Sequence, residues 1–225
     1  MTSSRPAPTA LTASVVIAGD DVHEDLFTAS VELQDLLAGA GFVTRVRVGT
    51  ALFAQPFDDD LVVLYRAAGA FTAAERRGLA DAVAAGTGLL ALHSTAVYDD
   101  DPELLALFGA RYTDHGPQPH ESRFRVECAA HPVTAGLDPF ELTHEHYRVA
   151  TAPDARVVAW RQAPYGVEPL VVVSEPGDGR VCFVQFGHDQ RAWDEPGVRR
   201  TVANAAGWLT AGRRNPFLSD TEKED

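Results

Sequence analysis

Three of the eight histidines in this sequence come directly or shortly after stretches that are typical of buried β-strands. His93 follows the apolar run 88–92, His188 follows the run 180–186 after one glycine, and His23 lies just beyond the first apolar run. In open α/β sheets, ligands bind outside the carboxyl ends of the strands. Imidazole exchanges protons near neutral pH and also binds metals. The three positions therefore predict a functional site, although a polar residue at a strand end can also simply cap backbone groups.

A second candidate group lies in the segment 143–147, Thr-His-Glu-His-Tyr. In an extended segment, Glu145 and Tyr147 lie on one side, and His144 and His146 lie on the other. A carboxylate and a phenol on one face suit recognition of a hydroxyl group or transfer of a proton. The same pattern is also typical of a solvated edge strand, so both interpretations stay open here.

We expect candidates from these distant regions to converge. His93, Glu145 and His188 are predicted to be catalytic, with His115 and Tyr147 nearby. Imidazoles and a carboxylate also suit Zn²⁺ or a similar divalent ion, since a catalytic zinc site needs only three protein ligands. The metal candidates are His93, His115 and His188. The sequence leaves open whether they bind a metal or exchange protons without one.

Several familiar catalytic patterns are absent from the sequence. There is no G-x-G-x-x-G after the first apolar run and no G-x-x-x-x-G-K-[ST], so nothing favours dinucleotide or P-loop chemistry. Neither H-E-x-x-H nor G-x-S-x-G occurs. The two cysteines, Cys128 and Cys182, lie in apolar runs outside any C-x-x-C pair. We interpret them as reduced packing residues of a cytoplasmic protein.

The charge balance disfavours some classes of partner. Nineteen basic and 32 acidic side chains give a formal net charge of −13, which disfavours nucleic acid and anionic membrane surfaces. No apolar run reaches the roughly 18 residues of a spanning helix, and the first residues lack the apolar centre of a secretory signal. We expect a small-molecule ligand, no nucleic acid and no membrane, while a homo-oligomer remains possible.

Strands and helices alternate along the first half of the chain. Continuous apolar runs predict strands buried on both faces at 14–18, 61–65 and 88–92, and alternation predicts a more solvated strand at 42–48. Helices are predicted at 26–38 and at 72–85. The second of these begins with the capping-box pattern of Thr72 and Glu75. This order of elements predicts parallel pairing with right-handed crossovers.

The second half of the chain is richer in strands. They are predicted at 123–128, 156–161, 170–174 and 180–186, with a turn at 176–179 between the last two and a final helix at about 196–210. The fold class is therefore α/β, a doubly wound and mainly parallel sheet with an antiparallel hairpin near the C-terminus. We expect one domain at 14–211 between a mobile arm, 1–13, and an acidic tail, 212–225.

Five motifs occur in order along the chain: GLLALHS at 88–94, FGARYTDH at 108–115, HPVTAGL at 131–137, EHY at 145–147 and GH at 187–188. Their succession resembles the ThuA-like, or trehalose-utilisation, family over roughly residues 14–210. The resemblance implies a sheet like that of the class I glutamine amidotransferases, a flavodoxin-like arrangement. It also implies a role in sugar utilisation.

The amidotransferase likeness extends to single positions. The segment Val184–His188 resembles the Gln-Phe-His segment that carries the amidotransferase catalytic His, so Gln185 joins the candidates. The amidotransferase nucleophile is a Cys at a strand-to-helix turn, where this chain has His93 after Leu92. Glutamine hydrolysis by a thiolate is therefore not expected. The family's Asp-Glu-x-Tyr pattern begins here with His144, which leaves Glu145 and Tyr147 in place.

Three functions remain open at this point, and with them whether the chain is an enzyme. The leading hypothesis is a carbohydrate-processing protein for trehalose or a keto sugar, in which Glu145 is a general base or hydroxyl acceptor. Its expected substrate-binding residues are His23, His115, Tyr147 and Gln185. The first alternative is a non-catalytic binding or sensing domain on a degenerate amidotransferase scaffold. The second is a hydrolase in which Ser94 is the nucleophile and His188 is its base.

Overall fold

The computed structural model describes residues 10–20 and 22–212. Within them, nine strands form one sheet in the order β2-β1-β3-β4-β11-β10-β9-β6-β7. Two further strands, β5 (Ala110–Asp114) and β8 (Arg148–Thr151), pair with each other. Because helices connect many of these strands, the expected α/β class is confirmed.

The half of the sheet that begins at β2 is parallel. Each strand pairs in parallel with the next in the order β2 (Phe42–Val48), β1 (Leu11–Ala18), β3 (Leu61–Arg66), β4 (Gly88–Leu92) and β11 (Val181–Val184). Every residue of β3, β4 and β11 is buried, as is typical of apolar strands that are covered on both faces. The carboxyl ends of these parallel strands meet along one side of the sheet.

The other half is antiparallel. After β11 come β10 (Gly166–Ser174), β9 (Arg156–Ala163), β6 (Glu121–Cys128) and β7 (Phe140–Glu145). Each pairs antiparallel with its neighbour, and the register between β10 and β9 shifts between Pro169 and Val172. Since β7 ends at Glu145, this half of the sheet delivers a carboxylate to the end of the molecule where the parallel strands finish.

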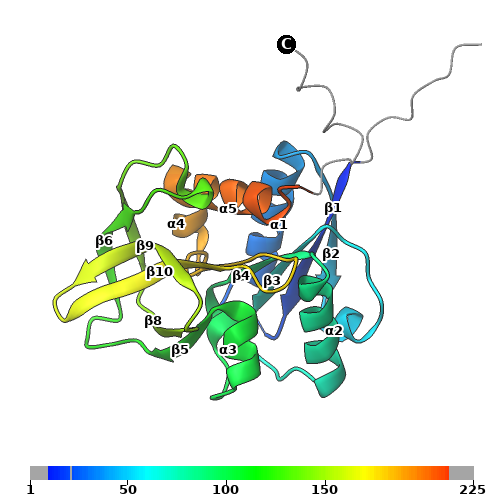
Figure 1. The fold of residues 1–225 in the computed structure, drawn as a ribbon. Coiled ribbons are helices and arrows are strands. Elements are labelled where there is room, and N and C mark those ends of the chain that lie inside the picture. The colour runs from blue at the N-terminus through cyan, green and yellow to red at the C-terminus, as the bar shows by residue number, and fades with distance from the viewer. Residues whose placement is uncertain (1–9, 21, 213–225) are drawn as a thin grey trace, which may run out of the picture.

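Helices cover both faces of the sheet (Figure 1). On one face, α1 (Leu26–Gly39) and α5 (Pro196–Leu209) contribute Leu33 and Val202 to one apolar core. On the other face, α2 (Ala73–Ala84) and α3 (Pro102–Phe108) contribute Leu79 and Phe108 to a second core. The remaining short elements are α4 (Gln190–Trp193) and three 3-10 turns, η1 (Ala51–Ala54), η2 (His93–Ala96) and η3 (Pro132–Thr134).

The capping box predicted at the start of α2 is confirmed. The Thr72 hydroxyl accepts a hydrogen bond of 3.2 Å from the Glu75 N–H, and the Glu75 carboxylate accepts one of 2.7 Å from the Thr72 N–H. Two amides that the helix leaves unpaired are thereby satisfied. This local pattern orders the first turn of α2, and the Thr50 hydroxyl, which donates to Glu75 Oε1 at 3.1 Å, adds a contact from outside the helix.

Several boundaries differ from the sequence predictions. β1 begins at Leu11, which pairs with Phe42, so residues 11–13 lie in the strand and not in the expected arm. The patterns did not predict α3, β5 or β8. Residues 1–9 of the expected arm and residues 213–225 of the expected tail lie outside the described residues.

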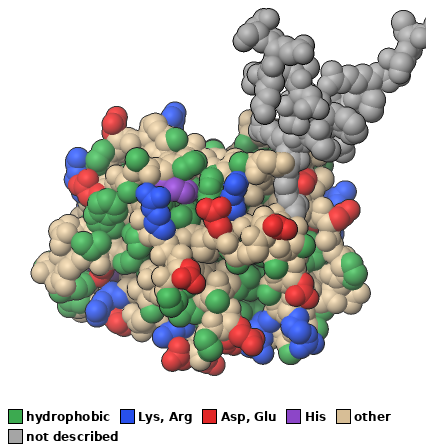
Figure 2. Space-filling view, viewed as in Figure 1, with side chains coloured by type: hydrophobic (Ala, Val, Ile, Leu, Met, Phe, Trp, Pro, Cys, Tyr) green, Lys and Arg blue, Asp and Glu red, His purple; other side chains and the backbone are tan. Residues whose placement is uncertain are grey.

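The surface carries charges of both signs. Figure 2 shows acidic and basic side chains interspersed on one face, with apolar side chains between them. Exposed large apolar residues include Val48 at the end of β2 and Val167 in β10. None of the helices in the described part of the chain has the length and apolar character that crossing a membrane requires.

Candidate functional site

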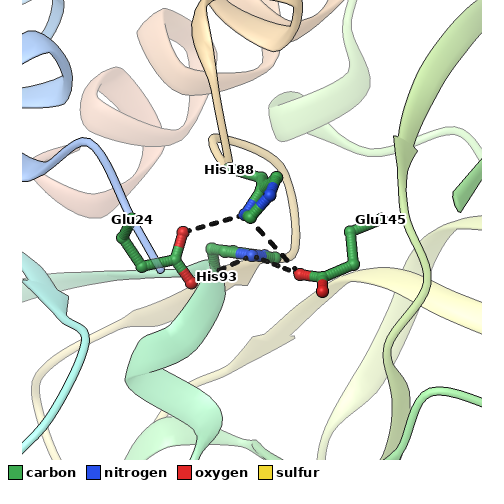
Figure 3. A group of neighbouring side chains, drawn as sticks. All are labelled: Glu24, His93, Glu145 and His188. Atoms are coloured by element: carbon green, nitrogen blue, oxygen red, sulfur yellow. Dashed lines mark hydrogen bonds and ion pairs between the residues drawn. The ribbon is translucent and has the colours of Figure 1, made fainter. Parts of the chain in front are cut away.

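Four ionisable side chains point toward one another at the end of the sheet (Figure 3). Glu24 lies between β1 and α1, His93 follows β4, His188 lies between β11 and α4, and Glu145 is the last residue of β7. One nitrogen or oxygen atom from each of them lies within 4.8 Å of the others. We call these four residues the Glu/His cluster.

Each imidazole of the Glu/His cluster contacts both carboxylates. His93 Nε2 lies 3.4 Å from Glu24 Oε1 and 3.3 Å from Glu145 Oε2. His188 Nδ1 lies 3.0 Å from Glu24 Oε2 and 3.6 Å from Glu145 Oε2. The four contacts form a closed ring, so displacement of any one side chain alters two of them.

His93 is held by its backbone and by its second ring nitrogen. Its φ of 42° is the one positive value at a non-glycine residue in the described part of the chain, a conformation that costs about 1–3 kcal/mol. His93 Nδ1 lies 2.7 Å from the carbonyl oxygen of Gln185; a carbonyl only accepts, so Nδ1 carries a proton. Nε2 therefore faces the cluster, where it is buried and has no hydrogen bond of good geometry to any described residue.

Glu24 is a buried carboxylate with a fixed orientation. The Tyr65 hydroxyl donates a hydrogen bond of 2.7 Å to Glu24 Oε2. Burial alone would raise the pKa of Glu24, but the hydrogen bond with His188, the nearby His93 and the Tyr65 hydroxyl lower it below its usual value. Glu24 is therefore a carboxylate anion inside the protein.

Glu145 faces the cluster with one oxygen and His115 with the other. His115 Nε2 lies 3.0 Å from Glu145 Oε1, and its Nδ1 lies 2.6 Å from the Tyr112 hydroxyl. Burial would raise the pKa of Glu145, but His93, His188 and His115 lower it to about 2. The carboxylate is thus ionised and oriented by imidazoles on two sides.

His188 is positioned by a buried neighbour, His144. His144 Nδ1 donates to the Glu145 carbonyl oxygen at 2.8 Å, and its Nε2 accepts from the N–H groups of Gly187 and His188 at 3.2 and 3.3 Å. Burial lowers the pKa of His144 to about 3, so the ring stays neutral and keeps its acceptor nitrogen. The hydrogen bond between His188 and Glu24 raises the pKa of His188.

The cluster has a buried side and an accessible side. The side chains of His93 and Glu24 are 0% and 2% exposed, whereas those of Glu145, His188 and His115 are 20%, 25% and 32% exposed. A ligand from solvent would therefore meet Glu145, His188 and His115 first. His93 and Glu24 would reach it from beneath.

The structure brings together most of the residues that the sequence singled out. His93, Glu145 and His188 form the ring, and His115 contacts its outer side. Tyr147 stacks on the His93 ring, with centroids 4.3 Å apart. His144, on the opposite side of β7 from Glu145, also contacts His93, at 5.1 Å between centroids.

Two expected substrate-binding residues, His23 and Gln185, lie outside the Glu/His cluster. His23 is exposed and makes no hydrogen bond or ion pair within the described residues, because the chain turns its neighbour Glu24 inward instead. Gln185 is completely buried. In the amide orientation that satisfies both of its atoms, its oxygen accepts a hydrogen bond of 2.8 Å from the Tyr147 N–H and its nitrogen donates one of 3.0 Å to the Pro169 carbonyl oxygen. The roles of His23 and Gln185 in substrate binding therefore stay predictions.

The hydrolase alternative lacks its required contact. Ser94 is buried, and its hydroxyl oxygen has no hydrogen-bond partner among the described residues. His188 Nδ1 instead lies beside Glu24 and Glu145. The expected Ser94–His188 hydrogen bond is therefore absent from the described part of the chain, since the turn after β4 directs His93 into the cluster and buries Ser94.

Sequence reasoning missed Glu24 and the positioning role of His144. Glu24 lies six residues beyond β1, at the same end of the sheet as His93 and His188. The rule that singled out the strand-end histidines would have found Glu24 if applied to carboxylates as well. No sequence pattern marked the backbone contacts of His144, because they depend on how β7 packs beside residues 187–188.

The chain is similar in fold to several solved structures. A ThuA-like protein from Parabacteroides merdae is 18% identical with a TM-score of 0.76, and the match covers 91% of this chain and 92% of that one. A ThuA-like protein from Bacteroides uniformis is also 18% identical with a TM-score of 0.77, covering 96% and 100%. A β-galactosidase from Rahnella sp. R3 is 15% identical with a TM-score of 0.62, covering 88% of this chain and 31% of the enzyme.

Comparison with families gives a more specific result. None of the curated proteins compared with this chain matches it. The model of the family ThuA, described as trehalose utilisation, matches residues 14–209. That match runs from within β1 to the end of α5 and includes all four residues of the Glu/His cluster. The chain therefore belongs to the ThuA, or trehalose utilisation, family.

Proposed function

We propose that this chain is an enzyme of carbohydrate utilisation that binds trehalose or a keto sugar at the Glu/His cluster and transfers protons to and from it. The family description supports the substrate class. The observation that carries the proposal is the convergence of Glu24, His93, Glu145 and His188 at the carboxyl ends of the strands, where α/β sheets bind their ligands.

The accessible side of the cluster suits a polyhydroxylated ligand. Glu145 offers carboxylate oxygens that accept hydrogen bonds from hydroxyl groups, while His188 and His115 offer ring nitrogens that donate or accept. Of the three, His115 is the most exposed and also contacts Tyr112. A sugar over these side chains would meet several directional partners at once.

A keto sugar adds a reaction that these groups can perform. A C–H bond beside a carbonyl group is acidic enough for a side-chain base, whereas the other C–H bonds of a sugar are not. We propose that Glu145 takes this proton and that an imidazole gives a proton to the carbonyl oxygen, which leaves the proton count unchanged. General acid–base catalysis of this kind contributes about 10²–10⁴-fold to a rate.

Cysteine-dependent glutamine hydrolysis is not part of the proposal. His93 lies at the strand-to-helix turn that bears the nucleophile in amidotransferases. Cys182 lies within β11, where burial raises the pKa of its thiol, and Cys128 ends β6. Both cysteines are free, which supports a reducing compartment, and we propose the cytoplasm.

A panel of sugars tests the proposed function. Trehalose, related disaccharides and their 3-keto derivatives are screened by thermal unfolding, and each is then followed by NMR for conversion. At a ligand concentration 100 times Kd, binding adds about 2.7 kcal/mol to stability, so a bound sugar raises Tm. Stabilisation with conversion supports the proposal. Stabilisation without conversion would identify a binding domain instead, and no effect of any sugar would overturn the proposal.

A further inference from the structure

We propose that the Glu/His cluster binds one divalent transition-metal ion per chain. The ligand atoms are Nε2 of His93, Nδ1 of His188 and one carboxylate oxygen each from Glu24 and Glu145. The inference rests on the proposed function only in placing the ion at the sugar site. Ion binding itself can be measured without any sugar.

The contacts between the four side chains are close to the ligand spacing in a metal coordination sphere. With metal–ligand bonds of about 2.0–2.1 Å, tetrahedral ligands are about 3.3 Å from one another. Glu145 Oε2 lies 3.3 Å from His93 Nε2 and 3.6 Å from His188 Nδ1. Glu24 contacts the same two nitrogens through different oxygens, Oε1 at 3.4 Å from His93 and Oε2 at 3.0 Å from His188. Charge-assisted N–H···O hydrogen bonds, by comparison, are about 2.7–2.9 Å long. Three of the four contacts are well beyond that length, so the ring is wider than a set of optimised ion pairs.

His93 supplies an independent observation. Its Nε2 is completely buried, is directed at both carboxylates and has no hydrogen-bond partner in the described residues. A buried polar atom without a partner is costly. Because Nδ1 holds its proton against the Gln185 carbonyl oxygen, a neutral His93 presents the Nε2 lone pair to the cluster, which is the arrangement of a metal-binding imidazole.

Both carboxylates have partners outside the ring. The Tyr65 hydroxyl donates to Glu24 Oε2, and His115 Nε2 contacts Glu145 Oε1. Such outer contacts orient metal ligands and are typical of metal sites. The two oxygens of Glu145 face different partners: Oε2 faces His93 and His188, as a metal ligand would, while Oε1 faces His115. Glu145 Oε1 and the His115 ring therefore stay available to a sugar.

The donor set indicates the class of ion. Two carboxylates carry a charge of −2, which a divalent cation neutralises while both imidazoles stay neutral. Mixed imidazole and carboxylate ligands suit Zn²⁺, Mn²⁺, Fe²⁺ or Co²⁺, whereas Mg²⁺ and Ca²⁺ favour oxygen ligands alone. The rival arrangement is two imidazolium–carboxylate ion pairs without a metal, and the experiment separates the two.

The experiment uses the full chain, purified without a His tag and stripped with a chelator. Zn²⁺ and Mn²⁺ are titrated by calorimetry, and Co²⁺ is followed by its visible absorption, with Mg²⁺ as a reference. The variants are Glu24→Gln and His93→Asn, since asparagine tolerates a positive φ better than most residues. The matched control is His23→Ala, an exposed histidine next to Glu24 but outside the ring. Circular dichroism checks that each variant folds.

The expected result is stoichiometric binding of Zn²⁺, Mn²⁺ or Co²⁺ by the wild type and by His23→Ala, and its loss in Glu24→Gln and His93→Asn. Failure of the folded wild type to bind any of the three ions at stoichiometry would overturn the inference, as would undiminished binding in Glu24→Gln. If His93→Asn does not fold, the metal titration of Glu24→Gln alone tests the inference. Metal binding without any sugar effect would overturn only the proposed function, and sugar conversion by a chain that binds none of the ions would overturn only the metal site.

Discussion

Glu24 and His188 are 164 positions apart in the chain, and Glu24 Oε2 lies 3.0 Å from His188 Nδ1. The contact joins the segments that follow β1 and β11, two strands with β3 and β4 between them in the sheet. Tyr65, from β3, reinforces it, because its hydroxyl lies 2.7 Å from Glu24 Oε2 and 3.0 Å from the Gly187 carbonyl oxygen. These contacts thus connect the segments that follow β1 and β11 with the end of β3, at the place where the cluster forms.

Tyr65→Phe is expected to weaken metal binding while the protein stays folded. The change removes the hydroxyl that orients Glu24, and loss of such an outer contact costs about 10–100-fold in metal affinity. Calorimetric titration with Zn²⁺ measures the change in Kd. Tyr98→Phe is the control, since the Tyr98 hydroxyl donates to the Ala110 carbonyl oxygen at 2.8 Å and contacts no residue of the cluster. Equal Zn²⁺ affinity in Tyr65→Phe and the wild type would contradict the role of Tyr65.

Gly187→Ala is expected to destabilise the protein and displace His188. Gly187 has φ 119°, and an added Cβ would lie 2.9 Å from Cζ2 of the buried Trp193 ring. An unfavourable backbone conformation alone costs about 1–3 kcal/mol. Urea unfolding measures the loss. Gly207→Ala in α5 is the matched control: its Cβ would contact nothing within 4 Å, and a gain of about 0.4–1 kcal/mol is expected. If Gly187→Ala were as stable as the wild type, the predicted clash with Trp193 and the backbone strain at residue 187 would be contradicted.

Glu75→Gln is expected to make the free energy of unfolding less dependent on pH in the acidic range. Burial would raise the pKa of Glu75, but hydrogen bonds from the Thr72 backbone and from the Thr72 and Thr50 hydroxyls lower it below the ordinary 4.5. A lowered folded-state pKa contributes stability that is complete above the unfolded pKa and is lost as pH falls through the folded pKa.

Urea unfolding of the wild type and Glu75→Gln at a series of pH values measures this effect. The wild type should lose more unfolding free energy than the variant as pH drops below 4.5. Glu103→Gln, which changes an exposed carboxylate in α3, should follow the wild type. Parallel curves for the wild type and Glu75→Gln would contradict the prediction.

The buried parallel strands were readily predicted from sequence, whereas some shorter elements were not. β4 was predicted with its bounds because 88–92 is continuously apolar. α3 was missed although its signals are present: Asp101 caps it, Pro102 begins it and Gly109 ends it with φ 76°. At seven residues α3 is too short for its apolar periodicity to stand out.

The candidate site was partly predictable for a similar reason. His93 and His188 follow strands that are evident from sequence, so their strand-end positions could be inferred. Glu24 lies in a short polar connection where no periodicity shows which residue turns inward. Glu145 belongs to an antiparallel edge strand whose place in the sheet depends on pairing with β6. The ring contacts depend on tertiary structure, which local patterns do not encode.

The sugar site is tested most directly by the exchange of a single proton. A keto sugar found to bind is incubated in D₂O with the wild type, Glu145→Gln and Glu141→Gln, and NMR follows loss of the C–H signal beside the carbonyl group. Glu141 is an exposed carboxylate on the same strand, β7. We expect exchange in the wild type and Glu141→Gln and an exchange rate about 10²–10⁴-fold lower in Glu145→Gln. Equal exchange rates in Glu145→Gln and the wild type would contradict the assignment of Glu145 as the base.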